Sequence, residues 1–128
     1  MADYTTKRTD ELEPFYKGLF LKARDELGIT AFGLAIVTID ADHDHPDHDH
    51  PDQEEVYVVL EGTGTLEIDG GAETVPLDVG TLVRVGPNTK RRIVADTGSM
   101  RLIAIGGVPG QAYEPPEYSD VGAPDPLG

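Results

Sequence analysis

The stretch "HDHPDQEEVYVVLEG" (residues 48–62) joins a histidine-rich segment to an apolar run through four turn-prone residues. A β-strand points residues i and i+2 to the same side. His48 and His50 would therefore face one way, and Glu55 would share a face with Tyr57. The turn-prone connection lets the chain reverse, which brings the Glu55 carboxylate beside the two imidazoles. The stretch thus predicts a strand that opens on a cluster of potential metal ligands.

On both sides of this stretch, short β-rich runs alternate with turn residues from Thr30 onward. Seven runs follow one another at close intervals: "TAFGLAIVTID", "EEVYVVLEG", "GTLEIDGG", "AETVPLDVG", "TLVRVG", "KRRIVAD" and "MRLIAIGG". This pattern is typical of an all-β sandwich or barrel. Asp69-Gly70-Gly71 predicts a hairpin turn, because glycine tolerates the positive φ that such turns demand.

The two ends of the chain differ from this β-rich part. Thr9-Asp10-Glu11 resembles a helix start, and apolar residues then recur at roughly helical spacing until Gly28, namely Leu19, Phe20, Ala23 and Leu27. We expect one short helix that packs on the barrel. Residues 108–128 hold half of the ten prolines and predict an extended tail. The expected organisation is an N-terminal segment (1–29), a β-barrel (30–107) and this tail.

Composition limits the classes of protein. A chain of 128 residues fits one domain, and the absence of Cys excludes disulfides, thiolate zinc sites and cysteine nucleophiles. No apolar run approaches the ~20 residues that cross a bilayer, and the N-terminus lacks a signal-peptide core, so we expect a soluble cytoplasmic protein. Twenty-four acidic against ten basic residues give a formal charge of -14. This charge repels phosphate and anionic lipid, so neither nucleic acid nor membrane is an expected partner.

The histidines allow two versions of a metal site. Two imidazoles and one carboxylate that converge in a barrel suit a borderline divalent cation such as Fe, Zn, Mn or Ni. His43 and His45 repeat the pattern one five-residue block upstream of His48 and His50. The upstream pair would need a longer loop before Glu55, so we favour the downstream pair. His43 or His45 remains an alternative source of a further ligand.

The spacing His48-x-His50-x4-Glu55-x6-Gly62 resembles the first motif of the cupins. Cupins are small β-barrels, also described as double-stranded β-helices or jelly rolls, in which two His and a Glu bind a metal in the barrel mouth. The resemblance covers about residues 30–107. It implies an all-β cupin-type barrel and a homodimer formed by strand exchange or sheet contacts.

The second cupin motif, Gly-x5-Pro-x-Gly-x2-His-x3-Asn, matches only weakly. "GTLVRVGPNTKRRIVA" keeps the first glycine, Gly80, but Arg91 stands where a typical cupin has its fourth metal ligand. A guanidinium has no lone pair to donate to a metal. The resemblance therefore implies at most three ligands at the motif positions, or a vacant site.

Arg91 aligns with an inward-facing strand position, beside Ile93. A buried guanidinium needs a partner: Glu55, another barrel carboxylate or an incoming ligand. A structural ion pair and a ligand-binding role are both open.

Two functions follow. The first is a metal-dependent enzyme acting on a small organic acid, in which iron would support oxygen chemistry and the other ions would polarise a carbonyl. The second is a non-catalytic small-molecule-binding protein in which the metal site is degenerate or vacant. Arg91 and Tyr57 would contact the ligand, and Arg91 would fix its anionic group, so small organic acids should bind better than neutral sugars.

Overall fold

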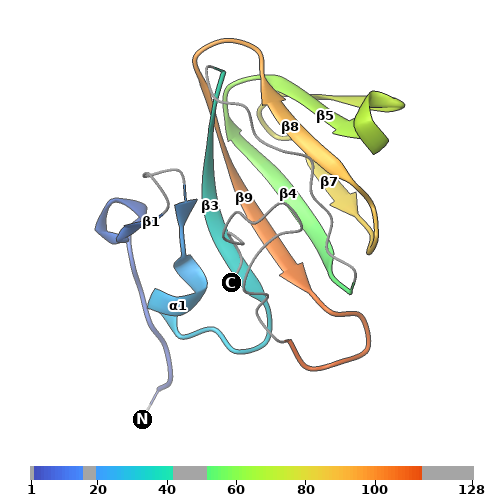
Figure 1. Cartoon of the computed structure of the whole chain (residues 1–128). Coiled ribbons are helices and arrows are strands. Elements are labelled where there is room, and N and C mark those ends of the chain that lie inside the picture. Colours follow the sequence, from blue (N-terminus) through green and yellow to red (C-terminus); the bar gives the residue numbers. More distant parts are fainter. Residues whose placement is uncertain (1, 16–19, 42–51, 114–128) are drawn as a thin grey trace.

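The computed structural model describes residues 2–15, 20–41 and 52–113. β-strands make up about half of this part and are its main secondary structure (Figure 1). The elements are η1 (Thr9–Glu11), β1 (Pro14–Phe15), β2 (Phe20–Leu21), α1 (Ala23–Leu27), β3 (Gly33–Asp40), β4 (Glu54–Glu61), β5 (Gly64–Ile68), η2 (Asp69–Gly71), β6 (Glu73–Leu77), β7 (Leu82–Val85), β8 (Arg91–Ala95) and β9 (Ser99–Gly107). The seven predicted strands correspond to β3 to β9.

The strands form two antiparallel sheets. One has the order β1-β2-β3-β9-β4-β7, and the other has the order β6-β5-β8. In Figure 1 the long strands β3, β9 and β4 lie side by side, and β5 and β8 belong to the second sheet. The last of the described strands, β9, lies between β3 and β4. The prediction of an all-β, jelly-roll type of fold is confirmed.

The core lies between the sheets, because the inward residues of both sheets form one buried cluster. Its strongly buried members from the large sheet include Ala35, Val37, Tyr57, Val59, Leu102 and Ala104, and those from the small sheet include Leu66, Leu77, Ile93 and Ala95. Burial alternates along β9, where every second residue from Met100 to Gly106 is buried. This alternation is the period-2 pattern expected of strands that pack on one face.

The N-terminal helix is shorter than predicted. Among the described residues the α-helix is limited to Ala23–Leu27. Gly28 ends it in the left-handed region at φ 76, where its N–H donates to the carbonyl oxygen of Arg24 at 3.0 Å. Phe20 instead belongs to β2 and pairs with Val37 of β3. The prediction that Phe20 lies in the helix is wrong, since pairing with β1 and β3 satisfies its backbone while its side chain is buried. Leu19 lies outside the described residues.

Two glycine-containing turns shape the small sheet. Asp69, Gly70 and Gly71 all have positive φ, at 51, 70 and 98, and connect β5 to β6, which confirms the predicted hairpin turn. Gly64 opens β5 where the two sheets approach each other. A Cβ at Gly64 would overlap the Val94 carbonyl oxygen and Met100 Sδ, so this position has no room for a side chain.

Candidate functional site

The inner face of β4 carries two of the predicted site residues. Glu55 is 1% exposed and Tyr57 is 5% exposed, whereas Glu54 and Val56 are half-buried. Glu55 and Tyr57 therefore share the buried face, as the strand period predicts. A carboxylate at this depth needs a compensating charge or hydrogen bonds.

Arg91 supplies that charge from the opposite sheet. It is the first residue of β8 and is 0% exposed. Ile93 is also buried, while Lys90 and Val94 are exposed. The predicted inward position of Arg91 thus agrees with the burial pattern, and its guanidinium reaches β4 across the interior.

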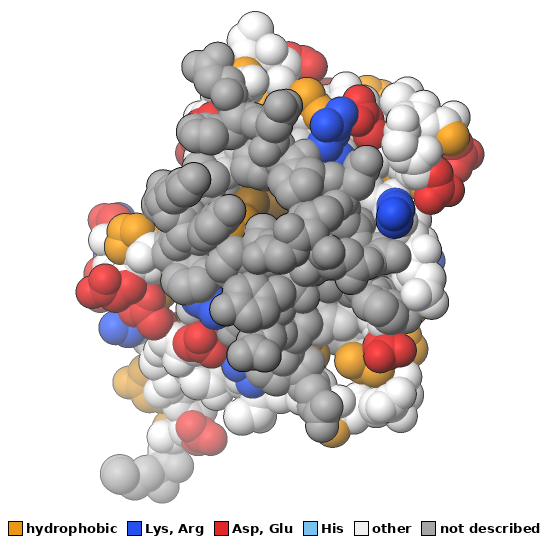
Figure 2. Space-filling model, viewed as in Figure 1, with side chains coloured by type: hydrophobic (Ala, Val, Ile, Leu, Met, Phe, Trp, Pro, Cys, Tyr) orange, Lys and Arg blue, Asp and Glu red, His pale blue; other side chains and the backbone are white. Residues whose placement is uncertain are grey.

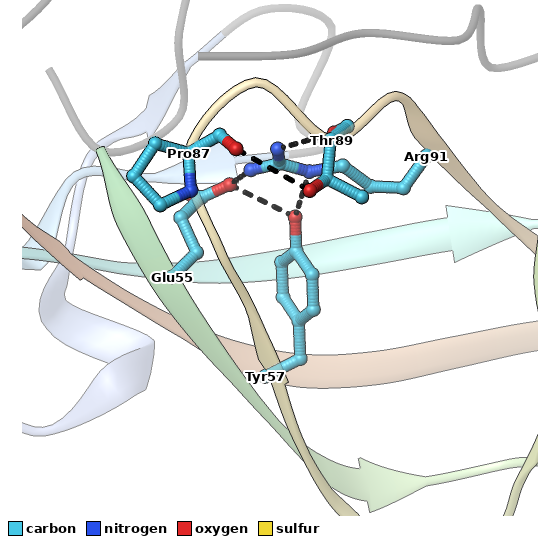
Figure 3. A network of polar contacts seen from close by, with 5 residues as sticks. All are labelled: Glu55, Tyr57, Pro87, Thr89 and Arg91. Carbon is cyan, nitrogen blue, oxygen red and sulfur yellow. Dashed lines mark hydrogen bonds and ion pairs between the residues drawn. The ribbon is translucent and has the colours of Figure 1, made fainter. Parts of the chain in front are cut away.

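Glu55, Tyr57 and Arg91 form a closed polar network (Figure 3). Arg91 NH2 forms an ion pair with Glu55 Oε1, and Arg91 Nε donates a hydrogen bond to the Tyr57 hydroxyl at 3.2 Å. The Tyr57 hydroxyl donates to Glu55 Oε1 at 3.0 Å. Arg91 NH1 donates to the carbonyl oxygen of Thr89 at 2.9 Å. All three guanidinium nitrogens therefore contact protein acceptors.

The connection between β7 and β8 closes this network on one side. Thr89 accepts from Arg91 through its carbonyl oxygen, and its own hydroxyl donates to the carbonyl oxygen of Pro87 at 3.4 Å. Figure 3 shows the Thr89 and Pro87 groups beside the guanidinium. Thr89 could not be identified from the sequence, because it accepts the hydrogen bond of Arg91 through its backbone carbonyl, which any residue type carries.

The charges of Glu55 and Arg91 compensate each other. A guanidinium beside a carboxyl group favours the ionised form of that group. Each buried ion costs several kcal/mol in lost hydration, and the cost is offset only when the partner and the hydrogen bonds are in place. The interior therefore contains a strongly polar but electrically neutral group.

Gln53 extends the polar face of β4 by one position. It is 4% exposed, it lies two residues before Glu55, and Asp52 beside it is exposed. Its Oε1 is buried and has no hydrogen-bond partner among the described residues. Leaving such an oxygen unsatisfied costs about 1–3 kcal/mol. Gln53 was expected in the turn before β4, although its position two residues before Glu55 already indicated that the two side chains share a face.

Of the predicted metal ligands, only Glu55 lies among the residues that the structure describes. His43, His45, His48 and His50 lie outside the described residues. Within residues 2–15, 20–41 and 52–113, no group of three or more His, Cys, Asp or Glu side chains could hold a metal ion.

Glu55 is the described member of the predicted metal set, and Arg91 is already paired with it. A divalent ion about 5 Å from the guanidinium would be repelled by about 7 kcal/mol at an effective dielectric constant of about 20. The described residues alone do not fit a divalent metal.

The surface was expected to discourage contact with nucleic acid and membranes. In the view of Figure 2, acidic and basic side chains are both scattered around the margin, without one continuous basic patch among the described residues. None of the helices in the described ranges has the length and apolar character needed to span a membrane. The expected partners, homodimer and cellular location remain predictions.

A family comparison agrees with this architecture. The model of the Cupin domain family matches residues 35–106, which is more than half of the 128-residue chain. The chain therefore belongs to the cupins, as the resemblance of its first motif implied. No functionally curated protein shows significant similarity to it.

Solved structures show the same fold. A cupin protein from Bacteroides fragilis is 26% identical, with a TM-score of 0.71 over 87% of this chain and 89% of that chain. A predicted oxalate decarboxylase from Thermotoga maritima is 16% identical, with a TM-score of 0.68 over 81% of this chain and 99% of that chain. A DMSP lyase from Ruegeria pomeroyi is 19% identical, with a TM-score of 0.54 over 60% of this chain and 38% of that chain. The latter two identities support the fold alone.

Proposed function

We propose that this cupin binds a small polar molecule between its two sheets, beside Glu55, Tyr57 and Arg91. In this proposal Arg91, and not a metal ion, balances the charge of Glu55. The buried ion pair between Arg91 and Glu55 carries this proposal. It corresponds to the second of the two functions expected from the sequence, in which the metal site of the barrel is degenerate.

The energetics of the pair support a binding role. Replacing a buried ion pair with well-packed apolar residues is often neutral or stabilises a protein by about 1–4 kcal/mol. Stability alone therefore does not explain why this apolar core contains the pair. A few polar groups that converge within an apolar cavity or barrel are typical of small-molecule sites.

The ion pair also bears on the charge of the ligand. An unpaired Arg91 would favour a small organic acid, because a guanidinium binds a carboxylate through two parallel hydrogen bonds. Here Arg91 already contacts Glu55, Tyr57 and Thr89. An incoming carboxylate would have to displace Glu55 and leave that charge buried. A neutral polar ligand avoids this cost.

A divalent metal held by His48, His50 and Glu55 is the second candidate. Tyr57 and Arg91 both hold Glu55 Oε1, and such hydrogen bonds orient carboxylates that bind metals. When bound, Fe, Zn, Mn or Ni would supply oxygen or Lewis-acid chemistry. Two structural neighbours bear the names of enzymes, so catalysis on a small organic molecule belongs to this candidate.

Replacing Arg91 separates the two candidates. We expect untagged wild-type protein to hold less than one equivalent of Zn, Mn, Ni or Fe by elemental analysis. We expect Arg91→His to bind Zn at least about tenfold more tightly by calorimetric titration, because it removes a charge and adds an imidazole. Arg92→Met is the matched control, since Arg92 faces the other way and pairs with Glu67.

The same titrations test the binding proposal itself. Wild-type protein is titrated with neutral polyols and sugars and with small carboxylic acids, and binding is followed by calorimetry and by the NMR signals of Tyr57. We expect at least one neutral compound to bind with a Kd of about 1 mM or below. One equivalent of tightly held metal in the wild type, together with no binding of any neutral compound, would contradict the proposal.

A further inference from the structure

The amide oxygen of Gln53 is a buried acceptor that has no partner within the part of the chain that the structure describes. Gln53, Glu55, Tyr57 and Val59 alternate with more exposed residues, so they form one continuous buried face. Glu55 and Tyr57 have partners within the network. Among the described residues, Gln53 Oε1 is thus an unsatisfied polar atom on the same face as the hydrogen-bonded groups of Glu55 and Tyr57.

Other unpartnered atoms in the described part of the chain do not share this position. Arg24 Nε belongs to a half-buried side chain of α1, beside Tyr113. Arg101 Nε belongs to a half-buried residue of β9 that points away from the core, between the buried Met100 and Leu102. Among these described residues, Gln53 is the one that carries such an atom on the same buried face of β4 as Glu55.

We propose that Gln53 Oε1 accepts a hydrogen bond from a hydroxyl group of the bound molecule and thereby selects small neutral compounds that carry hydroxyl groups. The inference rests on the proposed function. An amide oxygen accepts but does not donate, so it needs a donor on the ligand. A carboxylate ion has no such donor, and the neutral Glu55–Arg91 pair offers it no net positive charge.

The selection has a physical basis in the cost of leaving the acceptor unpaired. A site built to hydrogen-bond a hydroxyl group discriminates strongly against an analogue that lacks it, because the protein group then stays buried without a partner. Gln53 therefore acts as a specificity-determining residue. Gln53 lies on the same buried face of β4 as Glu55 and Tyr57, and it would contact the ligand separately from them.

Gln53→Met tests the inference by two measurements, the melting temperature of the free protein and the affinity for the ligand. Replacing a merely structural residue would not raise the first and lower the second. Methionine has a similar length and no acceptor oxygen, so the melting temperature of the free protein should rise by about 5 °C as the unsatisfied atom disappears. The Kd for the tightest-binding neutral compound among glycerol, ribose, glucose and inositol should increase about tenfold. Gln111→Met is the matched control, because Gln111 is exposed, and it should change neither value.

A second variant covers a failure of Gln53→Met to fold. Gln53→Asn keeps a neutral amide but withdraws its oxygen by one methylene group, so it should fold and should weaken the binding of the neutral compound by about threefold or more. Equal affinity in wild type and Gln53→Met, or a melting temperature that does not rise, overturns the inference, the latter because a bound water then satisfies the oxygen. If the wild type binds none of the neutral compounds, the proposed function fails, and the role of Gln53 fails with it.

Discussion

The buried pair of Arg91 and Glu55 predicts a large loss of stability when one partner is removed. The side chains of Arg91 and Glu55 are 0% and 1% exposed. Arg91→Met leaves the Glu55 carboxylate buried without its cation, which typically costs 3–5 kcal/mol, or about 4 kcal/mol here. For a protein whose total stability is about 5–15 kcal/mol, the midpoint of thermal unfolding should fall by roughly 10–20 °C.

The neighbouring pair on the outer face of β8 provides the comparison. Arg92 NH2 contacts Glu67 Oε1 at 2.7 Å, and these side chains are 35% and 26% exposed. Arg92→Met should therefore cost only about 0.2–1 kcal/mol. Urea unfolding followed by circular dichroism measures both variants and extrapolates the free energy of unfolding to water.

A double-mutant cycle attributes the loss to the pair itself. Glu55→Gln combined with Arg91→Met removes both charges, so it should cost at least about 2 kcal/mol less than the sum of the two single changes. Equal costs for Arg91→Met and Arg92→Met would refute the reasoning. Additive effects of Glu55→Gln and Arg91→Met would do the same, because they would mean that the two charges do not interact in solution.

Two further changes test the packing of the sheets and the histidine motif. Gly64→Ala should destabilise the protein by about 1–3 kcal/mol because its Cβ meets atoms of both sheets, whereas Gly107→Ala, with no atom within 4 Å of the new Cβ, should stay within about 0.5 kcal/mol in the same urea experiment. The histidine motif is tested by calorimetric metal titration in the Arg91→His variant. There, His50→Ala should abolish stoichiometric metal binding, whereas the double change of His43 and His45 to Ala should leave most of it. The affinity for metal should also fall as pH drops through about 6.5, where free imidazole becomes protonated. If the two histidine variants behave the other way round, His43 and His45 are the ligand pair.

Patterns that depend on neighbouring residues were readable from the sequence. The alternation in "VYVVL" placed Tyr57 inside, and the alternation in "RRIVA" placed Arg91 inside. Gly28 marked the end of the helix because a left-handed C-cap favours glycine. Each of these features follows from the local geometry of one strand or helix.

Features that depend on packing between distant segments were not readable in the same way. Phe20 fits a helical period, but its pairing with Val37 of β3 decided its conformation. The sequence offered three partners for Arg91, and only the arrangement of the two sheets selected Glu55. The burial of Gln53 likewise depends on what covers the start of β4.

The position of β9 has a consequence for how the chain folds during synthesis. β9 pairs with β3 through Gly33↔Gly106 and with β4 through Glu54↔Gly107. Of the described strands, β9 is thus translated last, and it bridges two strands that are translated much earlier. Contacts between such distant segments slow folding, because long loops must close first. Gly107 must leave the exit tunnel of the ribosome before the centre of the large sheet can form, so the edges of β3 and β4 that later pair with β9 stay open to chaperones until then.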